Sequence, residues 1–297
     1  MTGVQTCALP ISLNAANNTD ARANADASAT QGKLGIGAAV ALNAGSSETG
    51  AIVAAGAQVK GQGVSLEALM KTTASGDKLN SMGASALAGA GGRDIGVAGA
   101  AAINIETSTV EAVIGKGSSV NGGAGTVLLA AENDTANVVS ARPHAGGATG
   151  GNAGIGASLA LDIANNLTRA EVEDTGAVTT TGDLLLGAAS AHSAQVSAEA
   201  GARSDGGFAA APAVALAIEN NDTHVRLGAS TIATNIGGSV LGVAVHQSNV
   251  ETDAGGTAAG RDAAIGASLA LTLANDATQA QIDRDLAAGG SDRKSVV

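Results

Sequence analysis

The sequence contains no tryptophan, no tyrosine and a single phenylalanine, Phe208. Large aromatic and aliphatic side chains normally fill the core of a globular domain. Here the apolar residues are mainly alanine, with valine, leucine and isoleucine, and they accompany 43 glycines. Because small side chains fill only thin spaces, this composition argues against an ordinary globular domain and favours closely stacked layers.

Charge is also scarce, since only 14% of the residues are charged and the formal net charge is −11. The basic surface that binds nucleic acid is therefore missing, as are the interleaved aromatic residues that stack on single strands. No run of 18 apolar residues is free of polar interruption, so we expect no membrane-spanning segment. A positive mean hydropathy of +0.22 argues against disorder.

The two ends of the chain resemble translated sequencing-library adapters. Met1–Ile11 resembles one adapter read from a GTG start codon, and its last base begins the codon of Ser12. Asp292–Val297 resembles the companion adapter. We therefore assign residues 1–12 and 292–297, including the only cysteine, Cys7, to this artefact, and expect the natural protein to continue past both ends.

One short segment recurs five times along the chain, and we call it the anchor segment. Its copies are Ile36–Leu42, Val97–Ile103, Ile155–Leu161, Ala210–Leu216 and Ile265–Leu271, so the repeat is about 55 to 61 residues long. A Thr or Val follows seven residues after each copy, and an Ala or Val nine residues after it. A Gly-rich turn, a β-branched residue (Val59, Val120, Val178, Ile232) and a short apolar strand (beginning at Val64, Val127, Leu184, Val240) come next.

The anchor segment alternates with period two, which is the pattern of a β-strand. Ile155, Leu159 and Leu161 fall on one face, and Gly156 and Ala160 on the other. We take the small-residue face as the outer one. A solvated face is usually bulkier and more polar, so we expect a second layer to pack close against it, or neighbouring copies to stack there.

A unit of this length cannot bury its apolar face alone, whereas stacked units can. The sequence therefore predicts an all-β fold, a repetitive β-solenoid resembling a parallel β-helix. An array of small β-sandwich modules is the runner-up, although such modules usually keep an aromatic residue or two.

Glycine-rich turns at 91–94, 201–207 and 255–256 are expected before the anchor strands, and Pro212 should disturb the fourth anchor strand. The expected units are a preceding tail at 13–35, repeats at 36–94, 95–153, 154–207 and 208–262, and a truncated repeat at 263–291.

The segment Gly154–Val172 resembles the repeats of giant bacterial filamentous adhesins, above all the leukotoxin-type filamentous adhesins and related haemagglutinin-like proteins. The likeness spans roughly residues 13–288. It implies secretion across a bacterial outer membrane, an elongated solenoid stalk at the cell surface and a role in attachment to host or neighbouring cells. The family pattern carries no catalytic residues.

Candidate sites are few. The four histidines, His144, His192, His224 and His246, show no paired ligand spacing and are expected in solvent or in turns. Turn residues Asp94, Asp205 and Asp262 leave open a calcium-stabilised region like the RTX repeats. Phosphate-binding and nucleophile motifs are absent, so we predict no enzyme, no catalytic, cofactor-binding or metal-binding residues, no cofactor and no small-molecule substrate.

The predicted function is a stalk segment of a large secreted adhesin, and the alternative is a solenoid surface that itself contacts cells.

Overall fold

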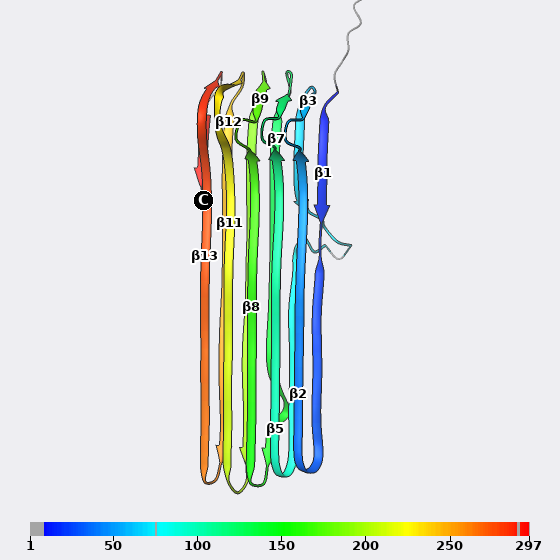
Figure 1. The fold of residues 1–297 in the computed structure, drawn as a ribbon, viewed down its shortest axis with the longest axis vertical. Coiled ribbons are helices and arrows are strands. Elements are labelled where there is room, and N and C mark those ends of the chain that lie inside the picture. Colours follow the sequence, from blue (N-terminus) through cyan, green and yellow to red (C-terminus); the bar gives the residue numbers. More distant parts are fainter. Residues whose placement is uncertain (1–8, 75, 290–291, 297) are drawn as a thin grey trace, which may run out of the picture.

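The computed structural model describes residues 9–74, 76–289 and 292–296, and within these it contains strands and no helix. The molecule is an array of long strands lying side by side (Figure 1). The strands are β1 (Ile11–Asn17), β2 (Asp20–Val53), β3 (Gln58–Lys60), β4 (Val64–Met70), β5 (Asn80–Ile114), β6 (Ser119–Asn121), β7 (Val127–Gly150), β8 (Ala153–Val172), β9 (Ala177–Thr180), β10 (Leu184–Ser204), β11 (Phe208–Ile236), β12 (Val240–Gly260), β13 (Ala263–Ala288) and β14 (Asp292–Val296).

Successive turns of the chain, which we call coils, pair in parallel and in register. Leu42 pairs with Ile103, Ile103 with Leu161, Leu161 with Leu216, and Leu216 with Leu271, so the last residues of the five anchor segments form one row. Every strand pairing within the described residues is parallel. The predicted all-β solenoid is confirmed.

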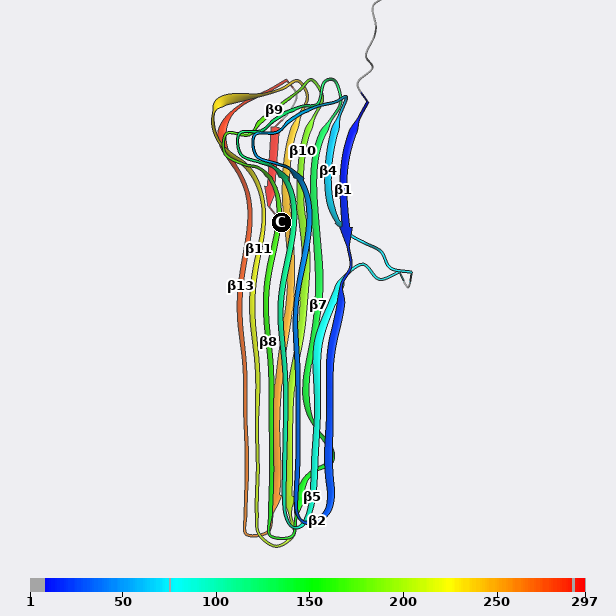
Figure 2. The same cartoon turned by 45° about the vertical axis from the view of Figure 1, so that its right-hand side comes forward.

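Each coil contributes one strand to each of two facing layers. The front layer, nearest the viewer in Figure 1, holds β8, the 208–227 part of β11, the 263–282 part of β13, and residues 34–53 and 95–114. The back layer holds β7, β10, β12 and residues 20–30 and 80–91. Short strands such as β3, β6 and β9 join the layers at one end, where the two layers separate (Figure 2).

Two local insertions make the coils unequal in length. Paired side chains of neighbouring coils are 61 residues apart at Asn43 and Asn104, 58 at Asn104 and Asp162, and 55 at Asn166 and Asn221. The first coil contains a loop between β4 and β5. The second contains a bulge in β7 between Ala141 and Ala148, where the register with β10 shifts. The insertions leave the pairing of the anchor segments intact.

The interior changes character along the strands. At the end with the short strands, the core consists of large aliphatic residues, including Leu66, Ile114, Leu129, Leu184 and Leu227, all buried. At the opposite end, the buried cluster is almost entirely alanine. The backbones approach so closely there that a Cβ at Gly156 would collide with the carbonyl group of Gly201. The solenoid is therefore thin where its side chains are small.

The assignment of the two faces of the anchor strand was wrong. The face of small residues is the inner one, since Ala211, Ala213 and Ala215 are at most 1% exposed. Leu159 and Ile155, on the bulkier face, are 39% and 37% exposed. A second layer does pack against the alanine face, because the back layer lies there. The gap between the layers admits only small side chains, so the larger ones project outwards.

Smaller expectations also need correction. Gly255 and Gly256 lie inside β12, and the bend before β13 falls at residues 261–262. The residue equivalent to Val178 is the buried Thr234, whereas Ile232 is exposed. Pro212 interrupts pairing with β8 only locally, because Ala210 and Ala213 still pair.

The segments assigned to adapters are partly described. Residues 1–8 and Val297 lie outside the described residues, whereas Ile11 and Ser12 pair with β4, and β14 pairs with β12.

The thin interior predicts sensitivity to added volume. Ala198 is fully buried in β10. The substitution Ala198→Leu should lower the free energy of unfolding by about 1–3 kcal/mol, because overpacking forces the two layers apart. Ala189→Leu, at an exposed position on the same strand, is the matched control and should change stability by less than about 0.5 kcal/mol. Urea unfolding followed by circular dichroism measures both. Equal effects of the two substitutions would contradict the thin core.

Candidate functional site

A layer of polar side chains crosses the interior between the aliphatic end and the alanine end. Asn43 Nδ2 donates to Asn104 Oδ1 at 2.7 Å, and Asn104 Nδ2 donates to Asp162 Oδ1 at 2.7 Å. All three residues are buried. Asn104 accepts from the preceding coil and donates to the next, and the ladder ends at an aspartate.

A second ladder of the same kind runs through the later coils. Asn166 Nδ2 donates to Asn221 Oδ1 at 2.8 Å, and Asn221 Nδ2 donates to Asp276 Oδ1 at 2.7 Å. A one-residue slip between coils would place these side chains on the outer face and leave their partners unpaired. The ladders therefore specify the register of the stack and give the buried amide N–H groups an acceptor in the next coil.

Two histidines belong to this layer on the back side. The hydroxyl of Thr135 lies 2.9 Å from His192 Nδ1, and that of Ser190 lies 2.8 Å from His246 Nδ1. The two rings are 5.4 Å apart between centroids. Burial, helped by the neighbouring His246, lowers the pKa of His192 to about 3, so its ring is neutral at pH 7. The expectation of solvated or turn histidines was wrong for both residues.

The other two histidines are peripheral. His144 is half-buried in the bulge of β7. His224 lies on the outer side of β11, where its Nδ1 is 3.0 Å from Asp222 Oδ1 and its Nε2 is 3.8 Å from Glu171.

Three carboxyl groups in the interior layer have raised pKa values. Burial raises the pKa of Glu106 to about 7. Burial and the nearby carboxyl of Asp162 raise the pKa of Glu219 to about 9, and burial also raises that of Asp162. Both oxygens of Glu106, and one each of Asp162 and Glu219, have no hydrogen-bond donor. Glu219 is therefore an uncharged acid at neutral pH, which lowers the cost of burying it.

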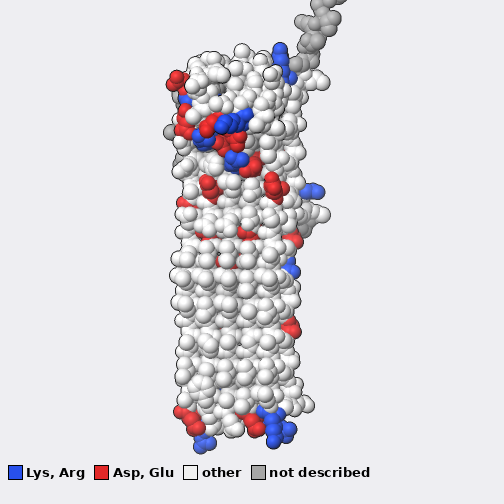
Figure 3. All heavy atoms as spheres, in the orientation of Figure 1, with Lys and Arg blue, Asp and Glu red and all other residues white. Residues whose placement is uncertain are grey.

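A network of ion pairs links the outer sides of several coils near the same level. Arg169 Nε lies 2.7 Å from Glu111, and Arg226 lies 2.8 Å from Glu171 and 2.9 Å from Asp283. The nearby imidazole of His224, together with the two arginines, lowers the pKa of Glu171 to about 2. These charges gather near one end of the strands (Figure 3). Such cross-coil pairs brace the stack in the same direction as the backbone ladders.

Beside this network, Arg284 is buried and forms hydrogen bonds with the backbone. Its guanidinium donates to the carbonyl oxygens of Gly228, Gly176 and Glu173. Sequence reasoning missed this residue, because nothing in the pattern of the repeat distinguishes it from a surface arginine.

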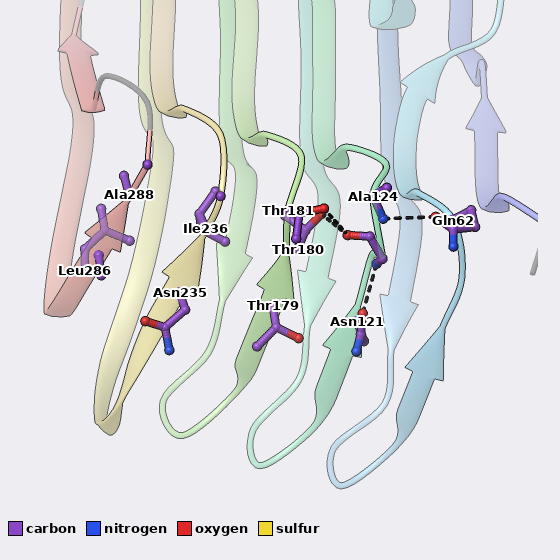
Figure 4. A pocket seen from close by; sticks show the side chains of 14 residues that line it. Gln62, Asn121, Ala124, Thr179, Thr180, Thr181, Asn235, Ile236, Leu286 and Ala288 are labelled. Atoms are coloured by element: carbon purple, nitrogen blue, oxygen red, sulfur yellow. Dashed lines mark hydrogen bonds between the residues drawn. The ribbon is translucent and has the colours of Figure 1, made fainter.

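A shallow trough lies beside the short strands (Figure 4). Asn121, Thr179 and Asn235 line it from successive coils, and Gln62 accepts a hydrogen bond from the backbone N–H of Ala124 at 2.9 Å. Thr180 and Thr181 both donate to the carbonyl oxygen of Gly123. None of the described side chains that line this trough is ionisable. It therefore offers no ionisable side chain for acid–base chemistry.

The turn aspartates lie at the end away from this trough. Asp205 Oδ1 lies 3.2 Å from Arg203 Nε, and both side chains are largely exposed. Within residues 9–74, 76–289 and 292–296, no three His, Cys, Asp or Glu side chains gather closely enough to hold a metal ion. Nor does this part of the chain include a helix with the length and hydrophobicity needed to cross a bilayer.

Comparison of the chain with protein-family models, with curated proteins and with solved structures finds no match.

The buried acid Glu219 predicts an unusual response of stability to pH. Its pKa is raised from 4.5 in the unfolded chain to about 9, so its contribution to stability is complete below pH 4.5 and is lost as the pH rises towards 9. Glu219→Gln should be more stable than the parent at pH 8 by about 1–3 kcal/mol, with a smaller difference at pH 5. Because both proteins contain His192, the difference between their free energies of unfolding in urea reports the effect of Glu219.

Glu251→Gln, at an exposed position of β12, is the control and should follow the parent at every pH. If Glu219→Gln also followed the parent, Glu219 would not be protonated in the folded state.

Proposed function

We propose that this chain is a stalk segment of a large secreted bacterial surface adhesin, which mediates or supports cell attachment. The observation that carries the proposal is the in-register stacking of equivalent coils, in which each coil pairs with its neighbours. Such an array extends by adding coils without redesigning a core. The likeness of Gly154–Val172 to filamentous adhesin repeats supports the assignment to the extracellular face of a bacterium. The proposal includes no enzymatic activity and no calcium site.

The stalk would grow perpendicular to the strands, which means sideways in Figure 1. A 20-residue strand such as β8 spans about 66 Å, whereas one coil adds about 4.8 Å of length. The array is therefore a broad blade rather than a thin rod. Most residues of a coil create lateral surface, and this observation favours the second candidate function, in which the solenoid surface itself contacts host or neighbouring cells.

Removing one whole coil tests the modular stalk. Because Leu161 and Leu216 are paired equivalents, deletion of residues 162–216 joins Leu161 directly to Ala217 with the strand phase unchanged. The shortened chain should retain its β spectrum by circular dichroism and cooperative unfolding. Deleting residues 162–215 instead shifts the phase by one residue and should prevent folding of the later coils. Collapse of both deletion variants would argue for one indivisible domain.

The location of the protein needs a separate experiment. Antibodies raised against the folded chain should label projections on the outside of intact source cells by immunogold electron microscopy. The same antibodies, applied as monovalent fragments, should reduce attachment of those cells. Labelling confined to the cell interior would contradict the surface proposal.

A further inference from the structure

The outer side of the front layer is apolar over all five coils. Every second residue in 36–44, 97–105, 155–163, 210–218 and 265–273, counted from the first, is Ala, Gly, Pro, Val, Ile or Leu, and these side chains point outwards. We call this surface the apolar face. Figure 3 views it directly, as the uncharged band between the charges at the two ends of the strands. The back layer is different, since its outer positions carry groups such as Asp134, Gln195, Glu199 and Glu251.

The apolar face remains accessible in the middle of the stack, where coils flank it on both sides. Ile155 and Leu159 in the third coil are 37% and 39% exposed, and Ile105 in the second is 40% exposed. The exposure of the apolar face is thus a property of the whole front layer and not only of its end coils. Soluble monomers rarely expose contiguous apolar patches of more than a few hundred Å², so this face indicates a binding surface.

The area matches that of a stable protein interface. Nine residues of extended strand span about 30 Å and five strands about 24 Å, which gives about 700 Å². A standard interface buries about 800 Å² on each partner. Each further coil would add about 150 Å² in the same pattern.

We propose that the apolar face binds the apolar face of a second copy of this chain, so that two blades pair laterally. A partner that covers the whole face must present flat apolar rows with the spacing of parallel strands, about 4.8 Å. A second copy has that spacing, and with a two-fold axis along the stacking direction each coil faces its own equivalent. This pairing extends the proposed stalk sideways and does not depend on the adhesive role.

The sizes of the side chains at two of the outward positions are complementary under this symmetry. With the axis over the third outward position of each anchor strand, the second position of one copy faces the fourth position of the other. The second positions are small: Ala38, Gly99, Ala157, Pro212 and Ala267. The fourth positions are large: Leu42, Ile103, Leu161, Leu216 and Leu271. At these two positions a large side chain of one face therefore meets a small one of the other in every coil, which is the interdigitation that two packed sheets need.

A lipid surface fits the apolar face less well. Surfaces that bind membranes usually carry Lys or Arg for anionic head groups and Trp or Tyr at the interface. This chain has neither Trp nor Tyr and a net charge of −11. The two arginines of its ionic network, Arg169 and Arg226, are already paired with Glu111, Glu171 and Asp283 beside the same face.

Sedimentation velocity of the intact chain at increasing concentration tests the proposal. We expect a dimer, and Leu159→Glu should weaken it at least tenfold, since it places a charge at the two-fold axis. Val138→Glu is the matched control, because Val138 is 44% exposed on the outer side of the back layer. It should leave the dimer unchanged. Circular dichroism must show that both variants keep the parent fold.

Cross-linking supplies a variant that retains an uncharged side chain. In a Cys7→Ser background, Leu159→Cys should form a disulfide-linked dimer under mild oxidation, while Val138→Cys should remain monomeric on denaturing gels. A chain that is monomeric at all concentrations would overturn the proposal. So would dimers that persist in Leu159→Glu, which indicate pairing through the strand edges, or a monomer that co-sediments with phosphatidylcholine vesicles, which indicates lipid binding.

Discussion

The in-register parallel pairing between successive coils is the constraint on which the rest of this structure depends. It places equivalent residues of every coil in one row, so a side chain is repeated along the whole stack. Rows of asparagine become hydrogen-bonded ladders, as in Asn43, Asn104 and Asp162. Rows of alanine become a continuous thin core. A row of outward-facing aliphatic residues likewise becomes a continuous surface, although a single exposed leucine would be unremarkable.

The thinness of the core follows from this repetition and explains most other features. Two flat layers approach closely only if all their inward side chains are small, and the buried alanines of β11 meet that condition in one strand. The space widens where the short strands separate the layers, and Leu129 and Leu184 fill it. Polar groups occupy the transition, where the amides can reach one another between coils. The buried acids there remain compatible with folding because Glu219 is uncharged at neutral pH.

The two outer surfaces divide the possible roles of the molecule. The polar back layer keeps the blade hydrated, whereas the apolar face provides area for association without charge. Because strands such as β8 are about 66 Å long, each coil adds little to the length of the array and much to its lateral surface. A broad blade resists bending across its width, and lateral pairing would stiffen it further. Both properties suit a support that holds a distal binding region away from a cell.

The sequence by itself determined the repeat pattern, the strand character of the anchor segments and the solenoid class. The five anchor segments, which end at residues from Leu42 to Leu271, alternate with a side-chain period of two. This period and the scarcity of aromatic residues are local properties, so both can be read from the sequence. Which face points inwards was decided only by the tertiary structure. Period two separates Leu159 from Ala160 but does not say which of them faces the second layer, because that depends on the distance between layers. The interior layer was missed for the same reason: His192 and Glu219 look like surface residues until the facing strands enclose them.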